Sequence, residues 1–93
     1  MKPKHPSQAG TFESSDVIVL IEPLEIGSGR KIEIESIVKL QYGDNLKTVV
    51  NEILDQYELT DIHIILKDKG ALEPVVKARL ETAILRSIDR QNQ

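Results

Sequence analysis

Hydrophobic and polar positions follow one another along this chain in patterns that predict three strands. Residues Val17 to Ile21 form an unbroken run of β-branched and aliphatic side chains, too short for a typical helix, which indicates a strand covered on both faces. Between Lys31 and Ile37, isoleucines alternate with glutamates, so this strand has one buried and one solvated face. Asp61 to Lys67 alternates in the same way and predicts a third strand, with His63 on its partly exposed face.

Two later segments have helical periodicity. Asp44 is suited to cap the first helix, and Pro74 fits the first turn of the second, where its missing N–H removes no intrahelical bond. The apolar stripe of the first helix is Leu46, Val49, Val50, Ile53, Leu54 and Tyr57. The stripe of the second is Leu72, Val75, Val76, Leu80, Ala83, Ile84 and Ile88.

The element order β-β-α-β-α predicts an α+β fold in one small domain, with a three-stranded, mainly antiparallel sheet and two helices packed on one face. The first two strands follow each other closely, so we expect them to form an antiparallel hairpin with 31–37 at the sheet edge. The simplest sheet order then places 17–21 in the centre, antiparallel to 61–67.

The ends of the chain differ from its middle in composition. Residues 1–12 are polar and contain Pro3, Pro6 and Gly10, which predicts a flexible N-terminal arm. Residues 13–90 form the expected domain, and residues 91–93 are a polar C-terminal tail.

Composition narrows the possible functions. The chain has 93 residues, a formal net charge of −3 and a single Phe without Trp, so it lacks the basic surface and the stacking aromatics of a nucleic-acid-binding protein. No apolar run approaches the ~20 residues that span a bilayer, and residues 1–11 contain no signal-like segment, so we expect a cytoplasmic protein.

Residues that could support catalysis are scarce. The absence of cysteine excludes a disulfide, a thiolate metal site and a cysteine nucleophile in this sequence. His5 and His63 are not at metal-ligand spacing, so we expect no metal site, and His63 is better explained as a structural histidine. We therefore expect no catalytic residue in this chain.

The segment Ala9 to Asp16 (AGTFESSD) holds the most informative side chains. Ser14 and Ser15 lie between two carboxylates, and no base, metal ligand or phosphate-binding glycine loop accompanies them. This composition suits a covalently modified serine better than a catalytic one. An enzyme with Ser14 as its nucleophile and an unmodified protein-interaction module, in which the serines are a surface turn or a kinase site, are the alternatives.

Three segments in register resemble the acyl carrier (gamma) subunit of citrate lyase. AGTFESSD is similar to that family's A-G-T-L-E-S-G-D, and Gln41 to Asp44 (QYGD), after the strand that ends in Glu22-Pro23, is similar to its Q-F-G-D. Residues Asp68 to Leu72 (DKGAL) and Lys77 to Glu81 (KARLE) are similar to its D-K-G-A-L and R-A-R-L-E. The resemblance covers almost the whole chain.

The resemblance implies a carrier function. In that family the serine of E-S-G-D, which corresponds to Ser14, carries 2'-(5''-phosphoribosyl)-3'-dephospho-CoA through a phosphodiester. The thiol of this group bears acetyl and citryl thioesters while citrate is cleaved to acetate and oxaloacetate. The implied partners are the alpha subunit, which exchanges acetyl for citrate, the beta subunit, which cleaves the citryl thioester, and the transferase that attaches the prosthetic group.

One departure from the family pattern concerns the site itself. Ser15 stands where the pattern has glycine, which makes it a second, less favoured candidate for attachment. The acyl carrier subunit of malonate decarboxylase is the nearest alternative family, and the strand ending Leu20 to Pro23 is compatible with both. The AGT and DKGAL segments favour citrate lyase. A fatty-acid-type acyl carrier, which is a helical bundle with a D-S-L motif, fits this strand-rich sequence less well.

Overall fold

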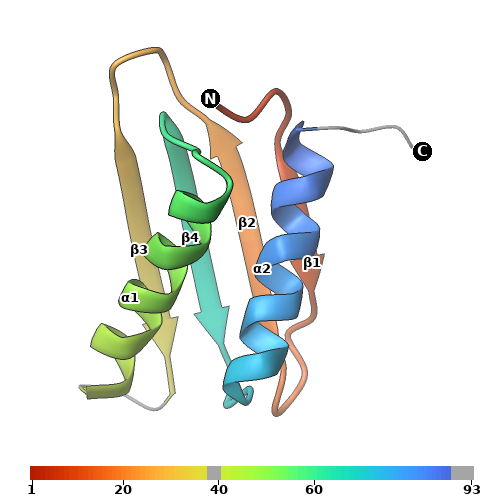
Figure 1. Cartoon of the computed structure of the whole chain (residues 1–93). Helices are drawn as coiled ribbons and strands as arrows, with labels where there is room; N and C mark the ends of the chain where they lie inside the picture. The colour runs from red at the N-terminus through yellow and green to blue at the C-terminus, as the bar shows by residue number, and fades with distance from the viewer. Residues whose placement is uncertain (38–40, 89–93) are drawn as a thin grey trace.

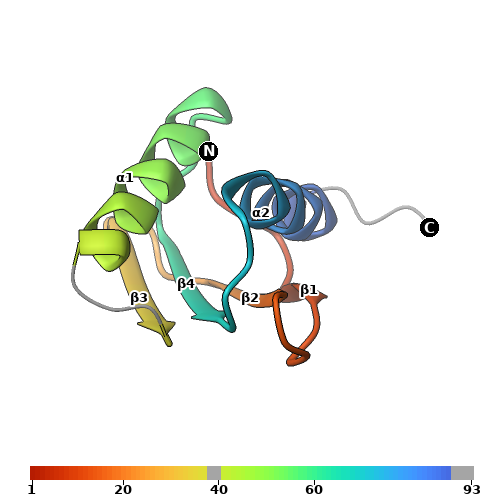
Figure 2. The same cartoon turned by 90° about the horizontal axis from the view of Figure 1, so that it is seen from below.

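The computed structural model describes residues 1–37 and 41–88, and describes 41–44 by their backbone only. The elements are β1 (Ser7–Gly10), β2 (Val17–Pro23), β3 (Arg30–Ser36), α1 (Gln41–Gln56), β4 (Ile62–Asp68) and α2 (Glu73–Ile88). Four strands form one sheet in the order β1-β2-β4-β3, and both helices lie on the same face of it (Figures 1 and 2). The predicted tail 91–93 lies outside the described residues.

The sheet has a fourth strand that the sequence did not predict. β1 lies inside residues 1–12, the segment expected to be a flexible arm, and it pairs antiparallel with β2 from Ser7 opposite Ile21 to Gly10 opposite Ile18. The C-terminal helix holds it in place, because the Ser7 hydroxyl donates to the carbonyl of Ala83 at 2.6 Å. A four-residue polar strand has little apolar pattern of its own, so these tertiary contacts determine its conformation.

The predicted hairpin between the second and third strands, β2 and β3, is wrong. β3 pairs in parallel with β4, and β4 pairs antiparallel with β2, so β4 lies between the two. The connection from β2 to β3 crosses the start of β4, where one oxygen of the buried Asp61 carboxylate accepts from the N–H groups of Gly27 (3.0 Å) and Gly29 (2.9 Å). β3 is at the sheet edge as predicted, since its alternating charged residues suit a strand exposed on one side.

The core lies between the helices and the sheet. Val17, Val19 and Ile21 of β2 face the helices and are almost completely buried, whereas Ile18 and Leu20 point to the face that carries no helix. Helices therefore cover only one face of this strand. The expected burial of its other face is confirmed at Ile18, which is 6% exposed, but not at Leu20, which is partly exposed. Neither helix, within the described part of the chain, is long and apolar enough to cross a membrane.

The helical stripes are confirmed, with two differences at the helix starts. The buried residues are Leu46, Val49, Val50, Ile53 and Leu54 of α1 and Val76, Leu80, Ala83 and Ile84 of α2. α1 begins at Gln41, three residues before the Asp44 that was expected to cap it. Leu72 precedes α2 and is 73% exposed, so it does not belong to the stripe.

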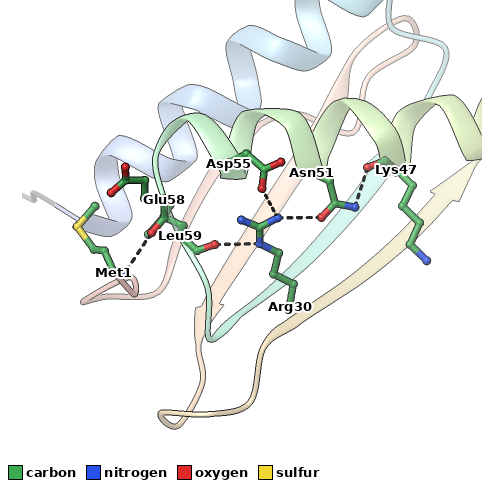
Figure 3. A network of polar contacts seen from close by, with 7 residues as sticks. All are labelled: Met1, Arg30, Lys47, Asn51, Asp55, Glu58 and Leu59. Carbon is green, nitrogen blue, oxygen red and sulfur yellow. Dashed lines mark hydrogen bonds and ion pairs between the residues drawn. The ribbon is translucent and has the colours of Figure 1, made fainter.

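Arg30 joins the first residue of β3 to the end of α1 (Figure 3). Its guanidinium donates to the Leu59 carbonyl at 2.9 Å and to the side-chain oxygens of Asn51 and Asp55 at 3.2 and 2.8 Å. The bond to Leu59 satisfies one carbonyl group beyond the helix end, and the three bonds together tie α1 to the edge strand.

Two glycines offer a matched test of the turn geometry. Gly10 has φ +97°, and a Cβ there would overlap the carbonyl oxygen of Val17, whereas Gly27 has φ +94° with open space around it. We expect Gly10→Ala to lower the free energy of unfolding by about 3 kcal/mol, because backbone strain and overlap add, and Gly27→Ala by about 1 kcal/mol. Urea unfolding of both variants measures the difference, and equal losses would contradict the close approach.

Candidate functional site

Residues 11–16 form the loop that connects β1 to β2, next to the connection from β4 to α2 at one end of the domain (Figure 1). Thr11 N–H donates to the Val17 carbonyl at 3.2 Å and closes the base of the loop. Ser14 and Ser15 are both exposed. The loop therefore presents two serine hydroxyls to solvent.

The Asp16 carboxylate organises this loop from within. Its Oδ1 accepts from the N–H of Val17 at 2.7 Å, and its Oδ2 accepts from the Thr11 hydroxyl at 2.6 Å. The Thr11 hydroxyl oxygen in turn accepts from the Glu13 N–H at 3.2 Å. Asp16 thereby connects the two ends of the loop, and its side chain points into the loop.

Arg79 of α2 completes the arrangement. Its Nε donates to Asp16 Oδ1 at 3.1 Å and its Nη2 to Oδ2 at 2.9 Å, a two-point contact between residues 63 positions apart. The hydrogen bonds from Arg79, then those from Thr11 and Val17, lower the pKa of Asp16 to about 2. Asp16 is therefore ionised at neutral pH, with its charge balanced by the guanidinium.

The backbone of Ser15 distinguishes it from Ser14. Ser15 has φ +65°, in the left-handed region that favours glycine, and its N–H donates to the Lys69 carbonyl at 2.8 Å. The Lys69 N–H donates to the Asp16 carbonyl at 2.9 Å. Two hydrogen bonds, one at Ser15 and one at Asp16, thus attach the loop to Lys69 in the β4–α2 connection. Ser15 thus occupies a position where glycine has the lower conformational cost.

The structure does not bring His63 to the serines. His63 pairs with Glu22, five positions along β2 from Val17, which at the usual rise per residue places it roughly 16 Å from the base of the loop. Its Nε2 lies 2.7 Å from Glu33 Oε2 on the neighbouring strand. His63 is therefore part of a cross-strand pair on the sheet surface.

Thr11, Lys69 and Arg79 are the site residues that sequence reasoning missed. Thr11 acts through its hydroxyl, Lys69 through its main chain and Arg79 from a helix distant in sequence. All three lie in segments that carry the family resemblance, which was the only available signal for them.

Comparison with known proteins relates the chain to two groups of subunits. Residues 4–87 match the protein family described as malonate decarboxylase delta subunit (MdcD). The chain is 44% identical to a citrate lyase acyl carrier protein of Edwardsiella ictaluri, over 96% of this chain and 90% of the relative. It is 48% identical to the protein of that name from Yersinia enterocolitica, over 89% of this chain and 84% of the relative.

A solved structure has the same fold. A chain in the crystal structure of a Pseudomonas malonate decarboxylase hetero-tetramer in complex with malonate superposes with a TM-score of 0.69 and 25% sequence identity, over 89% of this chain and 84% of that one. The chain therefore shares its fold with a chain of a malonate decarboxylase assembly.

Substitutions at Ser15 test the left-handed turn. We expect Ser15→Gly to unfold at the same denaturant concentration as the wild type or at a higher one, because glycine adopts φ +65° without steric cost. Ser15→Val places a β-branched side chain in the same conformation and should cost about 1 to 2 kcal/mol. A valine variant as stable as the glycine variant would show that residue 15 is not held in this conformation.

The lowered pKa of Asp16 predicts a particular dependence of stability on pH. A carboxyl group with a pKa of about 2 in the folded chain and about 3.9 in the unfolded chain stabilises the fold fully above pH ~4, and the effect is lost as the pH falls towards 2. The stability difference between wild type and Asp16→Asn should therefore be constant from pH 5 to 7 and shrink in acid. Thermal unfolding of both proteins from pH 2 to 7 measures it, and a constant difference down to pH 2 would contradict the assignment.

Proposed function

The chain belongs to the citrate lyase acyl carrier protein family, and on that premise we propose that it serves as the acyl carrier subunit of a citrate lyase, with Ser14 as the attachment residue. As a member of this family it is a carrier subunit of an enzyme complex and is not itself the catalyst. The observation that supports Ser14 is the backbone conformation of its neighbour. Ser15 has a left-handed conformation, φ +65°, which suits the glycine that the family pattern has at this position. The serine before it then corresponds to the modified one.

The residues of the loop fit a bulky phosphodiester at Ser14. Ser14 is exposed, whereas the carboxylate of Asp16 is engaged by Arg79 and Thr11. The charge repulsion that two free carboxylates would exert on an attached phosphate is therefore reduced to that of Glu13. Nothing has to unfold for a modifying enzyme to reach the hydroxyl.

The proposed prosthetic group is 2'-(5''-phosphoribosyl)-3'-dephospho-CoA. It supplies a terminal thiol on which acetyl and citryl groups are carried as thioesters, a function that a chain without cysteine cannot perform with its own side chains. The role of this chain is to anchor that group at Ser14 and to raise the local concentration of the acyl group at partner active sites.

The proposed partners follow from the same assignment. They are the citrate lyase alpha subunit, which exchanges the acetyl group for citrate, the beta subunit, which cleaves the citryl thioester, and the transferase that modifies Ser14. The cytoplasmic location expected from the sequence remains a prediction.

A carrier function in malonate decarboxylase is the second candidate. The family description and the fold of the Pseudomonas subunit favour it, whereas the curated relatives with 44% and 48% identity are named for citrate lyase. The two functions differ in the partner subunits and in the acyl group, not in the kind of attachment.

Intact mass spectrometry of the protein from its native source tests the attachment. We expect a mass above that of the bare chain, by the mass of the phosphoribosyl-dephospho-CoA group. Ser14→Ala should abolish this increase and Ser15→Ala should preserve it, because only Ser14 corresponds to the modified serine of the pattern. Attachment that persists in Ser14→Ala and disappears in Ser15→Ala would reverse the assignment.

A reconstitution distinguishes the two carrier functions. The modified, acetylated protein is mixed with citrate lyase alpha and beta subunits and citrate, or with the catalytic subunits of malonate decarboxylase and malonate. Oxaloacetate formed in the first mixture supports our proposal, whereas carbon dioxide formed only in the second supports the alternative.

A further inference from the structure

Arg79 is well placed to influence the modification of Ser14, although it lies on another element of the fold. The middle of α2 projects its guanidinium to the Asp16 carboxylate, with distances of 3.1 and 2.9 Å for the two hydrogen bonds. The Asp16 side chain is 13% exposed, and that of Arg79 is 41% exposed. A planar guanidinium that contacts both carboxylate oxygens fixes direction as well as distance.

Asp16, which Arg79 holds in place, is itself hydrogen-bonded to both ends of the loop. The two oxygens that accept from Arg79 also accept from Thr11 Oγ1 and from the Val17 N–H. Thr11 is the first residue of the loop and Val17 is the residue that follows it. Without the guanidinium, the carboxylate would lose the contact that holds it between them. The serine is thus presented on a loop whose base is fixed from α2.

We infer that Arg79 is a positioning residue for the attachment reaction, because through Asp16 it holds the 11–16 loop so that Ser14 is presented to the modifying transferase. This inference rests on the proposed function. In the reaction the bond from Ser14 Oγ to phosphorus forms while the bond from phosphorus to the leaving group of a phosphoanhydride-activated precursor breaks. The hydroxyl proton passes to a base of the transferase, and Arg79 does not take part in the bond changes.

A loop already ordered in the free carrier favours this step. A segment that stays mobile in the bound complex and becomes ordered only in the transition state loses conformational entropy in the chemical step, which lowers the rate of that step. Small displacements of a reacting atom also reduce rates strongly. The contribution of Arg79 should therefore appear in the rate of transfer from the bound complex.

The test compares Arg79→Ala with Arg86→Ala. Arg86 lies seven residues later on α2, and its guanidinium donates to the Gln8 carbonyl at 2.8 Å, so it joins α2 to β1 without contacting the loop. Transfer by the purified prosthetic-group transferase is followed by mass spectrometry at a range of carrier concentrations. We expect kcat for Arg79→Ala to fall about tenfold with KM changed less than twofold, and Arg86→Ala to match the wild type.

The pattern of kcat and KM separates positioning from stability. If Arg79 only stabilised the fold, its loss would lower the folded fraction of the carrier, which raises the apparent KM and leaves kcat unchanged. Asp16→Asn should reduce kcat at least as much as Arg79→Ala, and the double variant should lose no more than Asp16→Asn alone, because all three lack the two-point contact between Arg79 and Asp16. Arg79→Lys, which keeps the charge but not the two-point contact, should fall between wild type and alanine.

The outcomes also distinguish this inference from the proposed function. An unchanged kcat in Arg79→Ala, with wild type modified normally, would overturn the role of Arg79 and leave Ser14 as the attachment site. A wild-type chain that the transferase does not modify would overturn both. Should Arg79→Ala not fold, Arg79→Lys and Asp16→Asn decide the question by the same kcat measurement.

Discussion

The antiparallel pairing of β2 with β4 is the constraint on which the rest of this structure depends. It runs over seven residue pairs from Val17 opposite Asp68 to Pro23 opposite Ile62, and it joins the two most apolar strands at the centre of the sheet. β1 and β3 then add to its two sides, and both helices cover the face that carries Val17, Val19 and Ile21. The same pairing places the base of the 11–16 loop beside the β4–α2 connection, where the backbone of Lys69 is hydrogen-bonded to it.

The sequence predicted the elements better than their pairing. An unbroken apolar run identified β2, and helical periodicity identified both helices, since burial of a continuous apolar stripe on a helix requires that regular spacing. The partner of β3 could not be read in this way, because the alternation of Ile32 and Ile34 with glutamates fits an edge next to β2 as well as one next to β4. β1 was missed for a related reason. Its residues are polar or small, and they form a strand through contacts with β2 and α2.

In the candidate site, too, features set by neighbouring residues could be predicted from the sequence, whereas contacts between residues distant in sequence could not. The pair Ser14 and Ser15 could be singled out from the residues around it, and the family pattern favoured Ser14. That choice gained support from one backbone angle, φ +65° at Ser15. Arg79 could not be linked to Asp16 by any local pattern, because only the packing of α2 on the sheet brings residues 63 positions apart into contact. Segments that resemble the family marked both residues without indicating that they touch.

The attachment of the 11–16 loop to β4 and α2 bears on how a carrier of this kind visits two active sites. A serine at the tip of a loose tail would add the length of that tail to the reach of its prosthetic group. Here Thr11, Asp16 and Arg79 fix the loop that carries the proposed attachment serine to the body of the domain. The radius of travel of a group attached at Ser14 would then be the length of that group alone. For such a group to reach two partner active sites, there are two possibilities. Both sites lie within that radius of one docked carrier, or the whole domain turns between them.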